Sequence, residues 1–126
     1  VIGFSLGGGA LLAHAMTQPD VVSGAIAVYP FTAWIQNIDG LVSRFQVPLA
    51  LMAAGSDTYN NCCMIERALE IEKAAKARGK TFDMVVYDKA EHGYDLSGRN
   101  YLADASRDTW KRTEEALKRM HAETAK

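Results

Sequence analysis

Apolar residues fall along the chain in short uninterrupted runs that are separated by amphipathic segments. Four runs have the length and composition of buried strands, namely residues 1–4, 23–30, 47–55 and 81–88. Strands that are apolar at consecutive positions are typical of parallel sheets whose two faces are both covered. The pattern therefore predicts an α/β fold with a mostly parallel sheet of about four strands and flanking helices.

The remaining segments are mostly helical in pattern. Residues 6–16 are apolar almost throughout, so we expect a helix there that is buried on nearly every side. A second helix over 62–78 ends before Gly79, a suitable C-terminal cap, and the last helix begins at about Ala103. The side chains expected on the inward faces of these two helices are Ile65, Ala68, Leu69, Ile71, Ala75, Trp110, Thr113, Leu117 and Met120. Residues 31–46 lack a clear period and predict a loop with a short helix.

Composition and charge exclude several classes of partner. The chain has 126 residues, 48% apolar and 23% charged, as expected of one globular domain. A formal net charge of −1 gives no electrostatic reason to expect nucleic acid or an anionic membrane. No apolar run reaches the roughly 18 residues that a transmembrane helix needs. We therefore expect neither nucleic acid nor a membrane among the partners.

The two cysteines, Cys62 and Cys63, are neighbours in the sequence. Adjacent cysteines form disulfides poorly, and the pair lacks the spacing of a zinc site. We expect two reduced thiols near the start of a helix, and a cytoplasmic location.

The first chemical motif is "GFSLG" at residues 3–7, a G-x-S-x-G pattern between a strand and a helix. A serine in such a turn is lifted above the edge of the sheet, where its hydroxyl can act as a nucleophile. Positions 3 and 7 are expected to need glycine, which has no side chain, because the strand and helix backbones approach closely there. The alternative, a phosphate-binding glycine turn, lacks both the G-x-G-x-x-G order and the P-loop lysine.

A serine nucleophile needs a base, and the base needs an orienting acid. Asp57 lies three residues after the apolar run that ends at Ala54, and His92 lies in the loop after 81–88. Catalytic groups in open α/β sheets gather at the carboxyl ends of strands. The order Ser5, Asp57, His92 is that of α/β-hydrolases and predicts a hydrogen bond between His92 Nε2 and the Ser5 hydroxyl.

Other titratable residues fit these roles less well. Asp88 ends a strand but lies only four residues before His92, and no predicted strand leads into Asp39. His14 lies among small apolar residues and is expected to be a structural histidine with its hydrogen bonds satisfied. We expect His121 to be solvated on a polar helix and Glu91 to be a surface charge. No group of His, Asp and Glu residues has metal-binding spacing.

Four segments, "GFSLGGG", "AAGSD", "EHGYD" and "DTWKRT", carry a family resemblance. With them the chain resembles the C-terminal half of an α/β-hydrolase, most closely the dienelactone hydrolase family, over all of residues 1–126. The resemblance implies that Ser5 is the nucleophile, His92 the general base and acid, and Asp57 the orienting carboxylate, with the Leu6 N–H in the oxyanion hole. It further implies two-step acyl transfer on an ester or lactone, without a metal or organic cofactor.

The chain departs from the enzymes that give this family its name. Those enzymes use cysteine where this chain has Ser5, and they place an arginine soon after the catalytic histidine. Here Arg99 lies too far along to be assigned to that position, so a general carboxylic ester is the expected substrate. Three aromatic residues at or after the ends of predicted strands, Tyr29, Trp34 and Tyr59, are expected either to line the substrate site or to pack loops on the sheet.

In this fold, strands that precede the serine turn supply a second oxyanion donor and much of the acyl pocket. The 126 residues are therefore expected to form a partial domain without those N-terminal strands, inactive alone. We expect this domain to pair with an N-terminal half or to self-associate through the 1–4 edge. Two alternatives stay open: a serine peptidase or acyl-peptide hydrolase of the same superfamily, and an inactive hydrolase fragment that serves as an interaction module.

Overall fold

Strands and helices alternate along the chain in the computed structural model, which describes residues 1–124. In chain order the elements are β1 (Ile2–Phe4), α1 (Leu6–His14), the 3₁₀ turn η1 (Ala15–Thr17), β2 (Ala25–Val28), α2 (Ile38–Ser43), β3 (Leu49–Ala54), the 3₁₀ turn η2 (Tyr59–Asn61), α3 (Ile65–Ala77), β4 (Phe82–Tyr87) and α4 (Ala103–Thr124). Each of the four apolar runs holds one strand, and 31–46 holds the short helix α2, as predicted.

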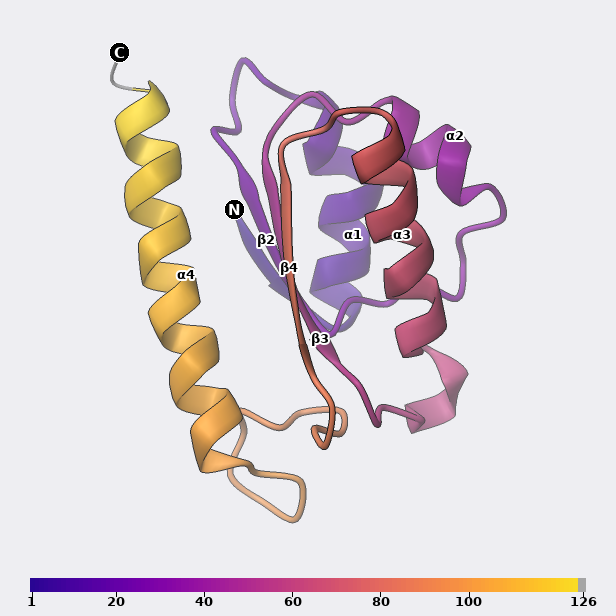
Figure 1. Ribbon diagram of the computed structural model, residues 1–126, viewed down its shortest axis with the longest axis vertical. Helices are drawn as coiled ribbons and strands as arrows, with labels where there is room; N and C mark the ends of the chain where they lie inside the picture. The colour runs from indigo at the N-terminus through magenta and orange to yellow at the C-terminus, as the bar shows by residue number, and fades with distance from the viewer. Residues whose placement is uncertain (125–126) are drawn as a thin grey trace.

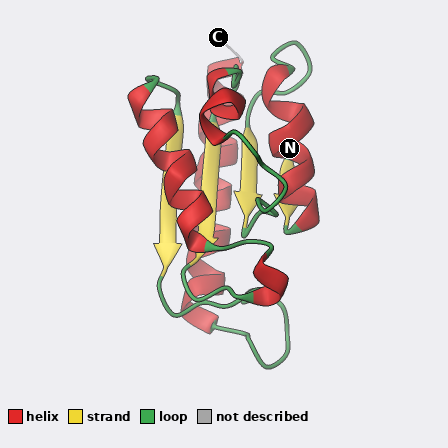
Figure 2. Ribbon diagram, turned by 90° about the vertical axis from the view of Figure 1, so that its right-hand side faces the viewer, coloured by secondary structure: helices red, strands yellow, loops and turns green. Residues whose placement is uncertain are grey.

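The strands form one parallel sheet in the order β1-β2-β3-β4. Every residue of β2 and β3 is buried, which explains why these runs are apolar at consecutive positions. All four strands point the same way, so their carboxyl ends lie together along one end of the sheet (Figure 2). The predicted parallel α/β sheet is confirmed.

Helices cover both faces of the sheet. Helices α1, α2 and α3 lie on one face and α4 lies on the other (Figure 1). The two hydrophobic clusters follow this division, since one joins α1, α2 and α3 to the sheet and the other contains Ala105, Ala116 and Met120 of α4. The sheet is therefore the middle layer of a three-layer structure.

Helix α1 is less buried than its composition predicted. Leu6 is 70% exposed, and Ala10 is exposed as well, because only the side of the helix that faces the sheet is covered. His14 ends the helix and is also exposed, so the expectation of a packed structural histidine is wrong. The apolar pattern showed a helix but could not show which side of it is covered.

The inward face of α4 also differs from the prediction. Thr113 and Met120 are buried as expected, but Trp110 is 54% exposed and Leu117 is 44% exposed. The buried stripe instead consists of Ala105, Ser106, Thr109, Thr113, Ala116 and Met120. Small side chains dominate this stripe, and they let the helix backbone lie close to the sheet.

In α3, Ala68, Ile71 and Ala75 face inward as predicted, whereas Leu69 is 44% exposed. Gly79 follows the helix with a φ of 64°, the left-handed conformation expected of a C-terminal cap. Although α4 has 22 residues, it is amphipathic and rich in charge. Within residues 1–124, no helix combines the length and apolarity that crossing a bilayer requires. The cytoplasmic location stays a prediction.

Strand β1 lies at the edge of the sheet, and its side chains Ile2 and Phe4 are 38% and 36% exposed. An apolar edge strand is a template for pairing with another chain. We therefore expect the isolated 126-residue chain to sediment as a dimer or larger species, and Ile2→Lys to shift it toward the monomer. Leu69→Lys on α3 is the matched control and should leave the sedimentation coefficient unchanged. A wild-type chain that sediments as a monomer would contradict this prediction.

Candidate active site

Ser5 occupies a sharp turn between β1 and α1. Its backbone has φ 51° and ψ −115°, a conformation that costs a non-glycine residue roughly 1–3 kcal/mol and is found mainly at functional sites. A Cβ at Gly3 would lie 2.4 Å from the Gly7 carbonyl oxygen, and one at Gly8 would lie 2.8 Å from Pro30 Cβ. A Cβ at Gly7 would meet open space, so the expected crowding at Gly7 is wrong. Positions 3, where the helix backbone lies close, and 8, where Pro30 lies close, have no room for a side chain.

Backbone hydrogen bonds hold this strained turn in place. The Ser5 N–H donates to the Val28 carbonyl at 3.0 Å, which continues the pairing of β1 with β2. The Ser5 carbonyl accepts from the N–H of Phe31 at 2.8 Å and of Gly9 at 3.0 Å. Both the neighbouring strand and the helix therefore fix the position from which the hydroxyl projects.

The predicted hydrogen bond between Ser5 and His92 is present. Ser5 Oγ lies 2.9 Å from His92 Nε2, and His92 Nδ1 lies 2.8 Å from Asp57 Oδ2. The three residues follow β1, β4 and β3 respectively, so the parallel sheet brings them together at the edge where its strands end. This continuous chain of hydrogen bonds can carry a proton from the hydroxyl to the imidazole.

Asp57 is enclosed by the protein and hydrogen-bonded at both carboxylate oxygens. Its side chain is fully buried, and its second oxygen, Oδ1, accepts a hydrogen bond from the Tyr59 N–H at 3.0 Å. A buried carboxylate that is held at both oxygens presents one fixed acceptor to the imidazole. The tertiary structure thus selects Asp57 as the residue that contacts His92.

The other carboxylates considered as partners of His92 make different contacts or are exposed to solvent. Asp39 forms a surface ion pair with Arg78 at 2.6 Å, and this hydrogen-bonded guanidinium lowers the pKa of Asp39. Asp88 is exposed, and its backbone carbonyl accepts a hydrogen bond from Ser56 Oγ at 2.6 Å. Glu91 and His121 are exposed, as predicted.

Two tyrosine rings hold the imidazole of His92. Tyr59 stacks on it, with 4.8 Å between ring centroids and an interplanar angle of 17°. Tyr29 packs at the same centroid distance but tilted by 57°, and its hydroxyl donates to Asp95 Oδ1 at 2.5 Å. Burial, and then the hydrogen bond to Asp95, raise the pKa of Tyr29 well above its ordinary value, so its hydroxyl keeps its proton. The ring is thus positioned by packing as well as by hydrogen bonds.

Of the three aromatic residues expected near the substrate, Tyr59 lines the two cavities described below beside His92. Tyr29 is 3% exposed, and Trp34 donates from Nε1 to the Phe31 carbonyl at 2.7 Å. One cavity beside His92, of about 390 Å³, is lined by Tyr59, His92, Gly93, Leu96, Ser97, Gly98, Arg99 and Asn100. A second, of about 270 Å³, is lined by Thr58, Tyr59, Glu91, His92, Arg99 and Asn100.

Sequence reasoning missed Leu96, Arg99 and Asn100 as cavity residues. The loop after His92 folds back on itself, and the Asn100 side chain donates to the His92 carbonyl at 3.0 Å. This contact brings Arg99 into the walls of both cavities although it lies seven residues after the histidine. The only available signal was that these residues follow the predicted catalytic histidine in the same loop.

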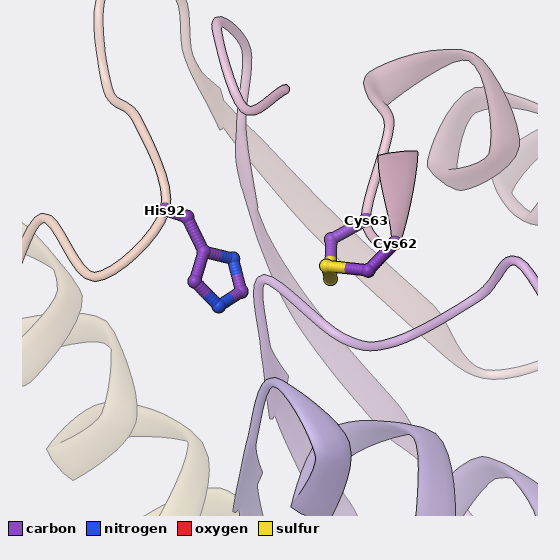
Figure 3. Close-up of side chains that lie close together, drawn as sticks. All are labelled: Cys62, Cys63 and His92. Carbon is purple, nitrogen blue, oxygen red and sulfur yellow. A yellow bond between two sulfur atoms is a disulfide. The ribbon is translucent and has the colours of Figure 1, made fainter. Parts of the chain in front are cut away.

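The adjacent cysteines form a disulfide between Cys62 and Cys63, so the expected pair of reduced thiols is wrong. The expectation rested on the rule that adjacent cysteines form disulfides poorly, but here the two sulfur atoms meet although the Cα atoms are 3.8 Å apart. The chain enters the pair through Asn60 and Asn61, which both have positive φ. Figure 3 shows the disulfide beside the His92 ring, and the two sulfur atoms and one ring nitrogen all lie within 4.8 Å of one another.

Known proteins are similar to this chain in sequence or in fold. A protein of Methylorubrum extorquens named "Putative carboxymethylenebutenolidase" is 27% identical in an alignment of length 128 that covers 91% of this chain and 40% of that protein. The acylaminoacyl peptidase of Pyrococcus horikoshii superposes with a TM-score of 0.77 at 18% identity, over 95% of this chain and 23% of that one. Esterase 2 of Thermogutta terrifontis superposes with a TM-score of 0.70 at 19% identity, over 94% of this chain and 53% of that one.

The parallel sheet, its two helical layers and the serine turn at the end of β1 define the α/β-hydrolase class of fold. The model of the dienelactone hydrolase family matches residues 1–121. The chain therefore belongs to the dienelactone hydrolase family, and it spans about half or less of the length of the relatives described above.

Proposed function

We propose that the protein is a serine hydrolase that cleaves carboxylic esters or lactones through an acyl-enzyme. The observation that carries the proposal is the continuous hydrogen-bonded chain from Ser5 through His92 to the buried Asp57. Membership in the dienelactone hydrolase family supports an ester or lactone as the substrate. The strained backbone of Ser5 supports its role as the nucleophile, since such strain is concentrated at functional sites.

In the first step, Ser5 Oγ attacks the carbonyl carbon while His92 Nε2 takes the hydroxyl proton. The carbonyl oxygen becomes an oxyanion, and the Leu6 N–H at the start of α1 stabilises it together with the positive end of the helix dipole. The protonated His92 then gives its proton to the leaving alkoxide. An alcohol departs, or a lactone ring opens, and the acyl group remains on Ser5.

Water completes the reaction by the same route. His92 Nε2 takes a proton from water, the resulting hydroxide attacks the acyl carbon, and the proton returns to Ser5 Oγ as the acid leaves. Asp57 keeps Nδ1 protonated, so that Nε2 presents its lone pair to the serine, and it stabilises the imidazolium in both steps. Tyr29 and Tyr59 keep the ring in the plane that these transfers need.

The cavity beside His92 suits part of the ester. Leu96 and Tyr59 offer apolar surface, whereas Arg99 and Asn100 offer hydrogen-bond donors. This mixed wall favours a small substrate with a polar or anionic end, and Arg99 would supply the positive charge that recognises that end. The cavity is open to solvent, which leaves room for the attacking water.

The proposal is tested on the whole protein with a fluorophosphonate probe and with p-nitrophenyl acetate. We expect covalent labelling at Ser5 and release of p-nitrophenol. Labelling that is absent from the folded protein would contradict the proposal and favour an interaction module. Cleavage of a peptide amide without cleavage of the ester would favour a serine peptidase of the same superfamily, which shares the serine turn and the glycine after the histidine.

A further inference from the structure

Two reactive side chains beside the candidate site have no role in the proposed reaction. Cys62 and Cys63 lie directly beside His92, although they come from the loop after β3 and His92 comes from the loop after β4 (Figure 3). Their sulfur atoms and a His92 ring nitrogen lie within 4.8 Å of one another. Within the part of the chain that the structure describes, these are the residues whose ligand atoms are grouped closely enough to hold a metal ion.

The cysteine backbone is anchored, so reduction need not separate the sulfurs from the histidine. The Cys62 carbonyl accepts from the N–H of Thr32 at 2.9 Å and of Ala33 at 3.1 Å. Cys63 is 6% exposed and Cys62 is partly exposed, which gives a reductant or an ion access from one side. The stacked Tyr59 ring, whose residue is 58% exposed, covers the histidine at the surface.

Cys62 and Cys63 can exist as a disulfide or as two thiols, and only the thiol form can bind a metal ion through sulfur. Two molecules of a small thiol reduce the disulfide by exchange: the small thiols are oxidised to their own disulfide, and Cys62 and Cys63 each gain one hydrogen. A disulfide offers no thiolate, whereas two thiolates and one imidazole form a ligand set typical of zinc.

We propose that Cys62, Cys63 and His92 form a thiol-gated site for a thiophilic divalent cation such as Zn²⁺. Both cysteines release their thiol protons when the cation binds. His92 contributes the lone pair of the ring nitrogen that lies within 4.8 Å of both sulfur atoms. A water molecule or an external thiol completes a tetrahedral set.

A cation on either ring nitrogen stops the proposed proton transfer: on Nε2 it occupies the lone pair that would accept the Ser5 proton. On Nδ1 it displaces the hydrogen bond to Asp57 and leaves the ring proton on Nε2, which then cannot accept. The reduced, metal-loaded protein is therefore inactive, and the disulfide form is protected from the metal. This inhibitory consequence rests on the proposed function, whereas the binding of the metal does not depend on it.

The test measures Zn²⁺ binding to the whole protein by isothermal titration calorimetry. One sample is reduced with a phosphine that is then removed, the other is oxidised, and thiol titration checks both states. We expect one additional bound Zn²⁺ in the reduced sample. Loss of an outer-shell partner weakens metal sites by about 10–100-fold, so Cys62→Ser, Cys63→Ser and His92→Ala should each weaken binding at least that much. His14→Ala, which removes an exposed histidine elsewhere, is the matched control and should bind normally.

Binding that is the same in both redox states, or unaffected by Cys62→Ser and Cys63→Ser, would overturn the proposal. A cysteine pair that stays reduced under oxidising conditions would also overturn it, because no disulfide would then form to prevent metal binding. Fluorophosphonate labelling, measured with and without Zn²⁺, provides the second readout. Zinc should suppress it in the reduced protein, and a chelator should restore it. If zinc binds as expected but the protein never labels, the metal site stands and the proposed hydrolase function fails.

Discussion

Ser5→Ala is expected to abolish covalent labelling and to lower kcat for p-nitrophenyl acetate by about 10⁴-fold or more. Alanine removes the hydroxyl oxygen that forms the acyl-enzyme in the proposed mechanism, while His92, Asp57 and the N-terminus of α1 remain. The variant should fold normally, because the Ser5 backbone makes the hydrogen bonds that hold the turn. Initial rates with saturating ester, together with a thermal melting curve, measure both properties.

Ser56→Ala is the matched control for this experiment. Ser56 is exposed, and its hydroxyl donates to the Asp88 carbonyl rather than to His92. Its labelling and its ester hydrolysis should stay close to those of the wild type. A folded Ser5→Ala variant that keeps more than about a tenth of the wild-type rate would rule out Ser5 as the nucleophile, because residual catalysis without a nucleophile is far weaker.

Asp57→Asn is expected to lower kcat by about 10⁴-fold while leaving the fold intact. The amide has the same shape as the carboxylate, and its oxygen can still accept from the Tyr59 N–H. Its NH₂ group would then face His92 Nδ1 and require that nitrogen to accept, which moves the ring proton to Nε2. In this tautomer the imidazole cannot take the proton of Ser5. Steady-state kinetics over a range of pH, with KM and kcat determined separately, measure the effect.

The control for the aspartate is Asp88→Asn, which changes the neighbouring carboxylate at the end of β4. Asp88 is exposed, and its contact with Ser56 uses the backbone carbonyl. Its kcat should therefore stay near the wild-type value. Equal losses in the two variants would mean that the net charge of this edge, and not the hydrogen bond from Asp57 to His92, controls the rate.

The sequence by itself determined the sheet and the positions of the three central residues. Strands that are apolar at consecutive positions are buried on both faces, which is typical of parallel sheets with helices on each side. Parallel strands end at one edge, so the residues that follow β1, β3 and β4 had to come close together. Local composition thus predicted that Ser5, Asp57 and His92 would meet, and the distances of 2.9 Å and 2.8 Å agree.

Only the tertiary structure decided which sides of the helices are covered. The spacing of Trp110 and Leu117 predicted an inward face of α4, but the helix turns Ala105 and Ala116 toward the sheet. Periodicity gives the angle between side chains around one helix and contains no information about the partner surface. That surface is built by β2, β3 and β4, which come from distant parts of the chain.

The surroundings of His92 were also decided by the tertiary structure. The stacked Tyr59, the tilted Tyr29, the cavity residue Arg99 and the Cys62–Cys63 disulfide reach the ring from three different loops. Contacts between loops depend on how each loop folds back after its strand, and strained or positive-φ residues such as Tyr29 and Asn60 set that path. Sequence patterns fix where a strand ends, because burial repeats along it, but a loop has no such repeat, so its contacts follow only from the packed whole.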